Sequence, residues 1–370
     1  MRPSRHGVLG LLVVLALTSL FWSGCSKEQS PIVAPDNPAM VVGANVPVIQ
    51  AAIGVQERNT KALMAMPDVV GTAVGLTDDG KPALLVLLAE PAKAAMPTTV
   101  EDLPVVTMVT GVIHPMAKPG GGGGGTSHTA KQTPPIQLGT SGGWRYDLAN
   151  GYCCGGTLGS LITNGTKQYV LSNTHVLAMD IVSGGNGRVC QIGDPVIQPG
   201  LIDVACNAAN AQNVATLASL ASLPQSNVDA AIAEVIPGMV RTDGAILEIG
   251  TISATTIAPA LNMSVKKSGR TTKLTTSTIS GLNASISVQY ENECAGGIAF
   301  TKTFTGQILV ANRSSRFLGS GDSGSLMVQN IATNPKAVGL LFAGSTSIAV
   351  AQPIGEVLAH FGGSYHMVGN

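Results

Sequence analysis

Residues 319–325 read Gly319-Ser320-Gly321-Asp322-Ser323-Gly324-Ser325 and are the sharpest local feature of this 370-residue chain. Glycines on both sides of Asp322-Ser323 permit a tight turn that lifts the serine hydroxyl clear of the backbone. The same turn can aim backbone N–H groups into one pocket, as an acyl-transfer intermediate requires. The pattern therefore predicts a nucleophilic serine, with an ordinary Gly/Ser loop as the alternative.

A serine nucleophile needs a base, and the base needs an orienting carboxylate. Of the six histidines only His175 stands where a predicted strand ends, although a structural histidine is the alternative there. Asp229 heads an apolar strand over 228–235, where a carboxylate is costly to bury without a partner. Asp203 and Asp180 are weaker candidates because both lie in turn-rich stretches. The chain order His175, Asp229, Ser323 is that of the chymotrypsin-type triad.

Short predicted strands dominate the chain from residue 136 onward. A strand over 157–163, the turn Asn164-Gly165 and a strand over 167–172 form a predicted hairpin. Further strands are predicted over 228–235, 247–252, 277–290, 306–310, 325–328 and 337–342, with one helix over 354–361. This spacing predicts a mainly β domain over 136–370, either a sandwich or a pair of barrels.

A small α+β module is predicted ahead of that domain, over residues 47–115. It comprises a helix over 47–66, a hairpin formed by 69–76 and 83–89 around Asp78-Asp79-Gly80, and a strand over 103–112. The module shows no motif with chemistry, and a covering or inhibitory role is one hypothesis for it. A run of six glycines, 120–125, then predicts a flexible linker over 116–135.

Composition excludes several classes of protein. The chain has 21 basic and 21 acidic residues, and only 11% of its residues are charged, so it lacks the basic footprint of a nucleic-acid binder. With 45 glycines and 21 prolines it is turn-rich, which argues against a coiled coil. No P-loop, dinucleotide fingerprint or H-E-x-x-H sequence is present, so we expect no cofactor and no metal. The basic run Lys266-Lys267, Arg270, Lys273 is interpreted as a solvated hairpin.

The N-terminus has the layout of an export signal. Arg2 and Arg5 precede an uncharged, Leu/Val-rich stretch, and Ser23-Gly24-Cys25 resembles the end of a bacterial lipobox, although Trp22 departs from it. We therefore expect a lipoprotein-type signal peptide over 1–24, lipidation of Cys25 and a tether over 25–46. The protein would be membrane-anchored in the periplasm or at the cell surface, or secreted if the lipobox is not used. An uncleaved anchor helix is the alternative.

Five cysteines remain beyond Cys25, so one thiol would be left over. Cys190 and Cys206 could close a short loop, worth about 3 kcal/mol in the chain-entropy model. Cys294 could pair with Cys153 or Cys154. A zinc site is the lesser alternative, because no C-x-x-C spacing is present.

Residues 136–360 resemble a trypsin/chymotrypsin-like serine peptidase of a bacterial subgroup related to plant narrow-leaf proteins, and the module before the glycine run also resembles what precedes the peptidase there. The resemblance rests on Gly156-Thr157-Leu158-Gly159-Ser160-Leu161, Leu171-Ser172-Asn173-Thr174-His175-Val176-Leu177, Gly193-Asp194-Pro195-Val196-Ile197-Gln198-Pro199-Gly200, Val228-Asp229-Ala230-Ala231-Ile232-Ala233, Lys267-Ser268-Gly269-Arg270-Thr271-Thr272 and Gly321-Asp322-Ser323-Gly324-Ser325.

The resemblance implies two antiparallel six-stranded β-barrels with the active site between them. It implies Ser323 as nucleophile, His175 as base, Asp229 as the orienting acid, and an oxyanion hole formed by the N–H groups of Gly321 and Ser323. It places Phe317, Ala343 and Gly344 at the specificity pocket, which favours an apolar or small residue at the cleaved position.

Two positions depart from the family. Val176 follows His175 where a cysteine that bridges back to the Cys154 position is common. No basic residue adjoins Ile136, so activation by a freed amine is not supported, and Asp322 needs another partner.

The sequence thus predicts an exported serine endopeptidase acting on proteins or peptides. A protease-fold binding protein with a latent or inactive triad is the alternative. Cleavage of the chain itself within 118–133 is a further hypothesis, and the oligomeric state stays open.

Overall fold

The computed structural model describes residues 40–93, 95–116, 128–149, 152–178, 188–291, 299–312 and 316–370. The predicted signal peptide, Cys25 and most of the tether lie outside the described residues, as do residues 117–127 of the predicted linker. In the part of the chain that is described, no helix combines the length and the apolar character needed to cross a membrane.

The first large sheet is built from the strands that precede and follow the predicted base. Its order is β10-β7-β13-β14-β15-β12-β11-β25. The bounds are β7 (Thr140–Trp144), β10 (Gly156–Leu158), β11 (Ser160–Thr163), β12 (Gln168–Ser172), β13 (Pro195–Gln198), β14 (Gln212–Leu220), β15 (Ala231–Val235) and β25 (His366–Met367). The predicted Asn164-Gly165 hairpin is confirmed, since β11 pairs antiparallel with β12 and Gly165 adopts φ +90°. Only Gly159 separates β10 from β11, so consecutive segments of the chain pair with β7 and with β12.

The second large sheet carries the nucleophile region. Its order is β19-β22-β23-β24-β21-β20-β2-β3-β5-β4, with a further β19–β20 pairing. The bounds are β19 (Ser264–Lys267), β20 (Thr275–Tyr290), β21 (Phe300–Ala311), β22 (Leu326–Gln329), β23 (Ala337–Gly344) and β24 (Ile348–Pro353), and within the module β2 (Val69–Leu76), β3 (Pro82–Leu88), β4 (Thr99–Val100) and β5 (Leu103–Val109). The mainly β class is confirmed, whereas two closed six-stranded barrels stay a prediction.

Short pairs and few helices complete the fold. The short strands are β1 (Val42–Gly43) with β18 (Ala260–Leu261), β16 (Ala245–Ile246) with β17 (Gly250–Thr251), β8 (Leu148–Ala149) with β9 (Tyr152–Cys153), and β6 (His114–Pro115), which pairs with β23. Among the described residues, the helices are α1 (Pro47–Met64), α2 (Thr174–Leu177) and α4 (Ile354–Phe361), with 3₁₀ turns over Leu201–Asp203 and Ala208–Asn210. The strand predicted over 247–252 is limited to Gly250–Thr251.

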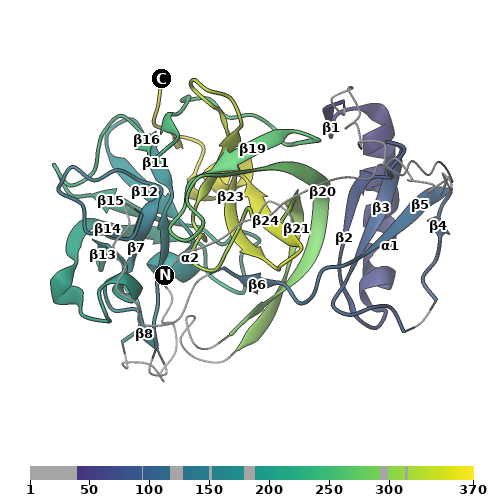
Figure 1. Ribbon diagram of the computed structural model, residues 1–370, viewed down its shortest axis with the longest axis horizontal. Helices are drawn as coiled ribbons and strands as arrows, with labels where there is room; N and C mark the ends of the chain where they lie inside the picture. The colour runs from purple at the N-terminus through teal and green to yellow at the C-terminus, as the bar shows by residue number, and fades with distance from the viewer. Residues whose placement is uncertain are drawn as a thin grey trace, which may run out of the picture. The chain divides into compact units, whose positions relative to one another are not determined.

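The N-terminal module is joined to the second sheet by main-chain hydrogen bonds. β2 pairs antiparallel with the middle of β20, a long curved strand that Figure 1 shows between β2 and β21. The predicted helix over 47–66 and the 69–76/83–89 hairpin are both confirmed, and β5 adds to β3 in parallel. A sheet therefore runs without interruption from the module to the strands around the predicted nucleophile.

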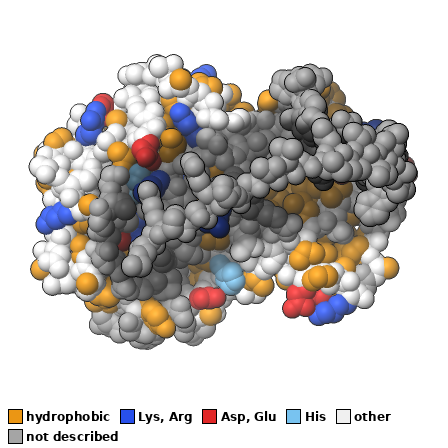
Figure 2. Space-filling model, in the orientation of Figure 1, with side chains coloured by type: hydrophobic (Ala, Val, Ile, Leu, Met, Phe, Trp, Pro, Cys, Tyr) orange, Lys and Arg blue, Asp and Glu red, His pale blue; other side chains and the backbone are white. Residues whose placement is uncertain are grey.

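Apolar residues of both sheets meet in a shared core. One cluster joins Ile162 and Leu171 of the first sheet to Leu326 and Leu340 of the second, and α4 closes it. Over the face drawn in Figure 2, charged side chains of both signs are interspersed, so the balanced composition is also balanced locally there.

Candidate active site

The turn that carries Ser323 can be made only with glycine at its flanks. Gly321 and Gly324 adopt φ +99° and +89°, a region that side-chain-bearing residues avoid. A Cβ on Gly324 would lie 2.0 Å from Ser172 Oγ and 2.3 Å from Thr157 O, and one on Gly321 would lie 2.5 Å from Thr271 Oγ1. The glycines of the motif thus serve both the backbone angles and close packing.

Strand β10 fixes this turn through Thr157. The Thr157 N–H donates to Ser323 O at 2.8 Å, and the Thr157 hydroxyl donates to Gly321 O at 2.9 Å. The hydroxyl oxygen in turn accepts from the Arg270 N–H at 3.0 Å. One threonine of the first sheet therefore holds the backbone of both the predicted nucleophile, Ser323, and the predicted oxyanion donor, Gly321, in place.

Asp322 has a buried cationic partner that sequence reasoning missed. Lys267 Nζ lies 3.4 Å from Asp322 Oδ2, and both side chains are fully buried. Asp322 also accepts from the N–H groups of Thr271, Thr272 and Gly319 at 2.8, 3.1 and 2.9 Å. Burial lowers the pKa of Lys267, and the neighbouring Asp322 opposes that shift.

The interpretation of the basic run as a solvated hairpin is wrong for Lys266, Lys267 and Arg270, which are buried, and holds for Lys273, which is exposed. The hairpin exists, as β19 and β20, but Lys267 is 0% and Arg270 7% exposed. Arg270 Nε donates to Asp203 Oδ2 at 2.7 Å and Arg270 Nη2 to Asp203 Oδ1 at 2.5 Å. Lys267 and Arg270 each have an acidic partner distant in sequence, which a local count of charges cannot reveal. Lys266, also buried, donates to the carbonyl of Ile331 at 2.7 Å. Asp203 is thereby committed to Arg270, and Asp180 lies outside the described residues.

The predicted base stands directly after β12, in the short helix α2. His175 Nδ1 and Asp229 Oδ2 are 2.5 Å apart, and the His175 N–H donates to Asp229 Oδ1 at 3.3 Å. Both side chains are buried, at 2% and 0% exposure. His175 Nε2 is buried and accepts or donates no hydrogen bond. Because Nδ1 is engaged by Asp229, Nε2 is the ring nitrogen that stays available for proton transfer.

Three residues that the sequence did not single out hold Asp229. The Tyr290 hydroxyl donates to Asp229 Oδ2 at 2.7 Å. Gln352 of β24 accepts from the Asp229 N–H at 2.6 Å and donates to Asp229 O at 2.7 Å, and Asn173 Nδ2 donates to the same carbonyl at 2.7 Å. Burial, followed by the charge of Asp229, raises the pKa of Tyr290 well above 10.0, so its hydroxyl stays a donor. In the sequence Tyr290 is only the last residue of a predicted strand rich in serine and threonine, which gives no sign of this role.

Ser323 approaches the pair from the second sheet. Its hydroxyl donates to Phe342 O on β23 at 3.0 Å and is not bonded to His175 Nε2. Phe342 belongs to the same buried aromatic cluster as Tyr290, with Phe304 between them in the packing. A Cβ on Gly156 would meet Val176, the neighbour of His175, at 2.6 Å and Ser323 O at 3.0 Å. Nucleophile and base thus lie on facing elements of the two sheets.

The residues predicted for the specificity pocket lie around the end of β23. Gly344 lines a cavity with Met116, Leu318 and Ser345. Phe317 and Ala343 are fully buried in neighbouring apolar clusters. The Phe317 carbonyl accepts from the hydroxyl of Thr275 at 2.9 Å.

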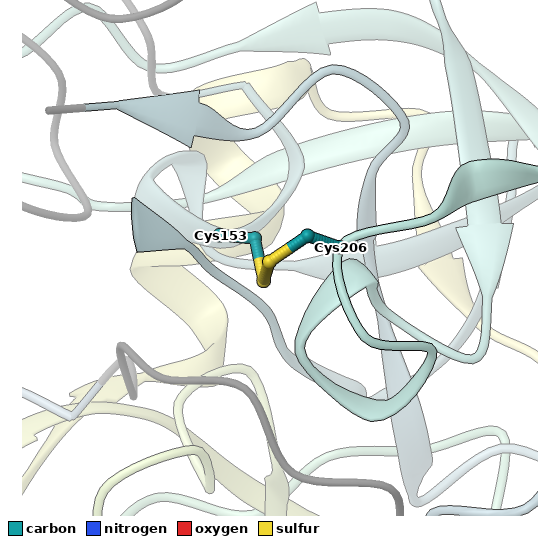
Figure 3. The surroundings of a disulfide bond; sticks show 2 residues. All are labelled: Cys153 and Cys206. Carbon is teal, nitrogen blue, oxygen red and sulfur yellow. A yellow bond between two sulfur atoms is a disulfide. The ribbon is translucent and has the colours of Figure 1, made fainter. Parts of the chain in front are cut away.

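The cysteines pair differently from the suggested short loop. Cys153 forms a disulfide with Cys206, across 53 residues, so the suggested Cys190–Cys206 bond is wrong (Figure 3). The two Cα atoms are 5.5 Å apart, and Cys153 packs in one apolar cluster with Leu201 and Val204, which lie just before Cys206. Cys154 is also disulfide-bonded. Cys294 lies outside the described residues.

No family model and no curated protein matches the chain. Solved structures similar to it include a glutamic-acid-specific serine protease described as using a histidine triad in substrate binding, at 18% identity and a TM-score of 0.39, covering 63% of this chain and 100% of that one. Thermobifida fusca protease A is similar at 20% identity and a TM-score of 0.41, covering 64% and 99%. Cellulomonas bogoriensis chymotrypsin gives 19% and 0.34, covering 58% and 91%. Such distant likenesses assign the chain to no family and transfer no activity to it.

Proposed function

We propose that the chain is a serine endopeptidase that hydrolyses peptide bonds through Ser323, His175 and Asp229. The observation that carries this proposal is the buried His175–Asp229 pair at 2.5 Å, which leaves Nε2 without a partner. A buried polar atom without a hydrogen bond is costly, and a substrate or a rotated serine hydroxyl would supply the missing bond.

The reaction follows from these positions. Ser323 Oγ attacks the substrate carbonyl while His175 Nε2 takes its proton, and the imidazolium formed is stabilised by Asp229. His175 then protonates the leaving amine, and water resolves the acyl-enzyme by the same steps in reverse. The N–H groups of Gly321 and Ser323 stabilise the oxyanion, each worth about 3 kcal/mol.

The first step requires the serine hydroxyl to leave Phe342 O. The hydroxyl must then turn towards His175 Nε2, and catalytic hydrogen bonds often form only when substrate is bound.

The proposed substrates are proteins or peptides with an apolar or small residue at the cleaved position. Phe317, Ala343 and Gly344 are the proposed pocket residues, and none of them offers a charge to a basic side chain.

The proposed architecture is a pair of six-stranded antiparallel barrels preceded by the module over 47–115 and the linker over 116–135. We propose export through the signal over 1–24 and anchoring through lipid on Cys25. The Cys153–Cys206 disulfide supports export, because such bonds persist in oxidising compartments.

A binding protein with a latent triad is the second candidate. It is favoured by one observation, that the Gly321 N–H is already taken by the carbonyl of Met116.

A fluorophosphonate probe separates the two candidates. Purified residues 26–370 should gain one adduct by intact mass, and Ser323→Ala and His175→Ala should gain none. Ser320→Ala is the matched control, an exposed serine three residues earlier, and should label as the wild type does. Wild type, both site variants and a Met116→Asp variant, which frees the Gly321 N–H, all remaining unlabelled would favour the binding protein.

A further inference from the structure

The segment that ends the N-terminal module lies along the strand beside the predicted nucleophile. β22 pairs with β23 only as far as Leu340, so the last residues of β23 have a free edge on that side. β6 occupies this edge in antiparallel fashion, with Pro115 opposite Ala343 and His114 opposite Gly344. Addition of an extended peptide to a strand edge is a general mode of peptide binding.

Main-chain hydrogen bonds bring Met116 to the nucleophile. Its N–H donates to Phe342 O at 3.1 Å, the same carbonyl that accepts the Ser323 hydroxyl at 3.0 Å. Its own carbonyl oxygen accepts from the N–H of Gly321, two residues before Ser323. The Met116 carbonyl therefore lies at the position where an oxyanion would be stabilised.

The Met116 side chain is half-buried in an apolar recess beside Leu318 and Gly344. A Cβ on Gly344 would lie 3.1 Å from Met116 Cε and 3.2 Å from Leu318 Cδ2, so glycine makes room for the methionine. Met116 packs on the apolar cluster that contains Phe317 and Leu318. A long, unbranched side chain suits such a recess. Pro115 is compatible with the pairing because the hydrogen bond to Phe342 comes from Met116.

The segment is also fixed upstream. Ile113 is fully buried, and its carbonyl accepts from the Gln289 N–H at 2.9 Å. The module before it is paired to β20 through β2. The segment His114–Met116, which lies against β23 next to Ser323, thus belongs to the same chain and is present at high effective concentration.

We propose that His114–Met116 is an intramolecular substrate, and that the protein hydrolyses its own peptide bond on the carboxyl side of Met116. The inference rests on the proposed function and defines its substrate class, peptides with a long apolar residue before the cut and proline tolerated one position earlier. The Ser323 hydroxyl oxygen bonds to the Met116 carbonyl carbon, and the bond to the following nitrogen breaks. That nitrogen receives, through His175, the proton lost by Ser323. Water then hydrolyses the ester, leaving a Met116 carboxylate and restoring Ser323.

Intact mass of purified residues 26–370, in denaturant, tests this proposal. The wild type and the Met116→Leu variant should each give two fragments, residues 26–116 and 117–370. The Ser323→Ala variant should stay whole. Met116→Asp places a charge in the apolar recess and should stay whole or be cut at least about tenfold more slowly. Met40→Asp, at an exposed methionine, is the matched control and should be cut as the wild type is.

Fluorophosphonate labelling of the same samples separates failure of this inference from failure of the proposed function. The Met116→Asp variant should be labelled at least about tenfold faster than the uncleaved wild-type chain. The reason is that residue 116 no longer occupies the site next to Ser323. A wild-type chain that labels but stays whole, or that is cut elsewhere, overturns self-cleavage and leaves the peptidase in place. If Met116→Asp, shown folded by circular dichroism, neither labels nor cleaves a peptide spanning residues 110–121, both proposals fall.

Discussion

Replacing Tyr290 with phenylalanine removes one hydroxyl from the site and leaves the ring packing intact. The ring stacks on Phe300 with centroids 4.7 Å apart and lies in a fully buried aromatic cluster, which a phenylalanine ring would fill equally. The lost group is the donor to Asp229 Oδ2 at 2.7 Å. The substitution therefore isolates one charge-assisted hydrogen bond.

The size of the effect follows from the burial of both partners. A hydrogen bond to a charged group contributes about 1.5–3 kcal/mol, and Asp229 has no water with which to replace the lost donor in a site that is 0% exposed. Asp229 keeps its hydrogen bonds to His175, so the carboxylate loses one of its donors and not all of them. We expect the free energy of unfolding to fall by about 2 kcal/mol at neutral pH.

The pH dependence carries the sharper signature. Burial and Asp229 raise the pKa of Tyr290 in the folded protein well above 10.0, its value in the unfolded chain. A raised folded pKa contributes stability that is fully present below the unfolded pKa and is lost as pH rises beyond it. The wild type therefore loses this contribution above about pH 10, whereas the phenylalanine variant has none to lose. The difference in the free energy of unfolding between the wild type and Tyr290→Phe should therefore become smaller above about pH 10.

Urea unfolding in a Ser323→Ala background, which prevents self-cleavage, measures both quantities at about pH 8 and about pH 10.5. Tyr152→Phe, at a tyrosine that is 42% exposed, is the matched control and should change stability by less than about 0.5 kcal/mol. A Tyr290→Phe variant as stable as the wild type at about pH 8 would refute the hydrogen bond. A gap that stays constant above pH 10 would refute the buried, protonated hydroxyl.

Three further predictions concern the supports of the site. Thr157→Val removes two hydrogen bonds under the nucleophile turn and should slow fluorophosphonate labelling about tenfold; an unchanged rate would show that the turn holds its shape alone. Lys267→Met leaves Asp322 buried without its cation, so the free energy of unfolding in urea should fall by about 3–5 kcal/mol, and a loss below about 1 kcal/mol would contradict the ion pair. Replacing Cys153 and Cys206 by serine should cost about 4 kcal/mol for a separation of 53 residues, and equal stability of wild type and variant would mean that this bond is absent in solution.

Local signals were sufficient for the parts of the site that are continuous in sequence. Glycine spacing predicted the turn around Ser323, and the Asn164-Gly165 hairpin predicted β11 and β12, which lead directly to His175. A costly carboxylate at the head of an apolar strand pointed to Asp229, and the structure joins it to His175. The hairpin and the turn could be predicted because each depends on a few neighbouring residues, whereas the catalytic roles of these residues stay predictions.

Partners distant in sequence were not predictable in the same way. Lys267 reads as one charge in a polar run, and only the fold brings Asp322 to it. Tyr290 ends an ordinary strand, and its role depends on a carboxylate 61 residues earlier. The pairing of Cys153 with Cys206 likewise needs the three-dimensional arrangement, because the shorter Cys190–Cys206 loop is favoured by chain entropy alone.

The pairing of β2 with β20 has a consequence for how the protein is made. Leu76 and Thr275 are about 200 residues apart, and ribosomes add about 5–20 residues per second. The edge of β2 therefore waits about 10–40 s for its partner strand to be synthesised. An unpaired, apolar strand edge is a template on which other chains can aggregate. During synthesis, folding of this protein therefore depends on protection of the β2 edge from other chains. The yield of soluble protein in a foreign host should fall as translation slows or as temperature rises.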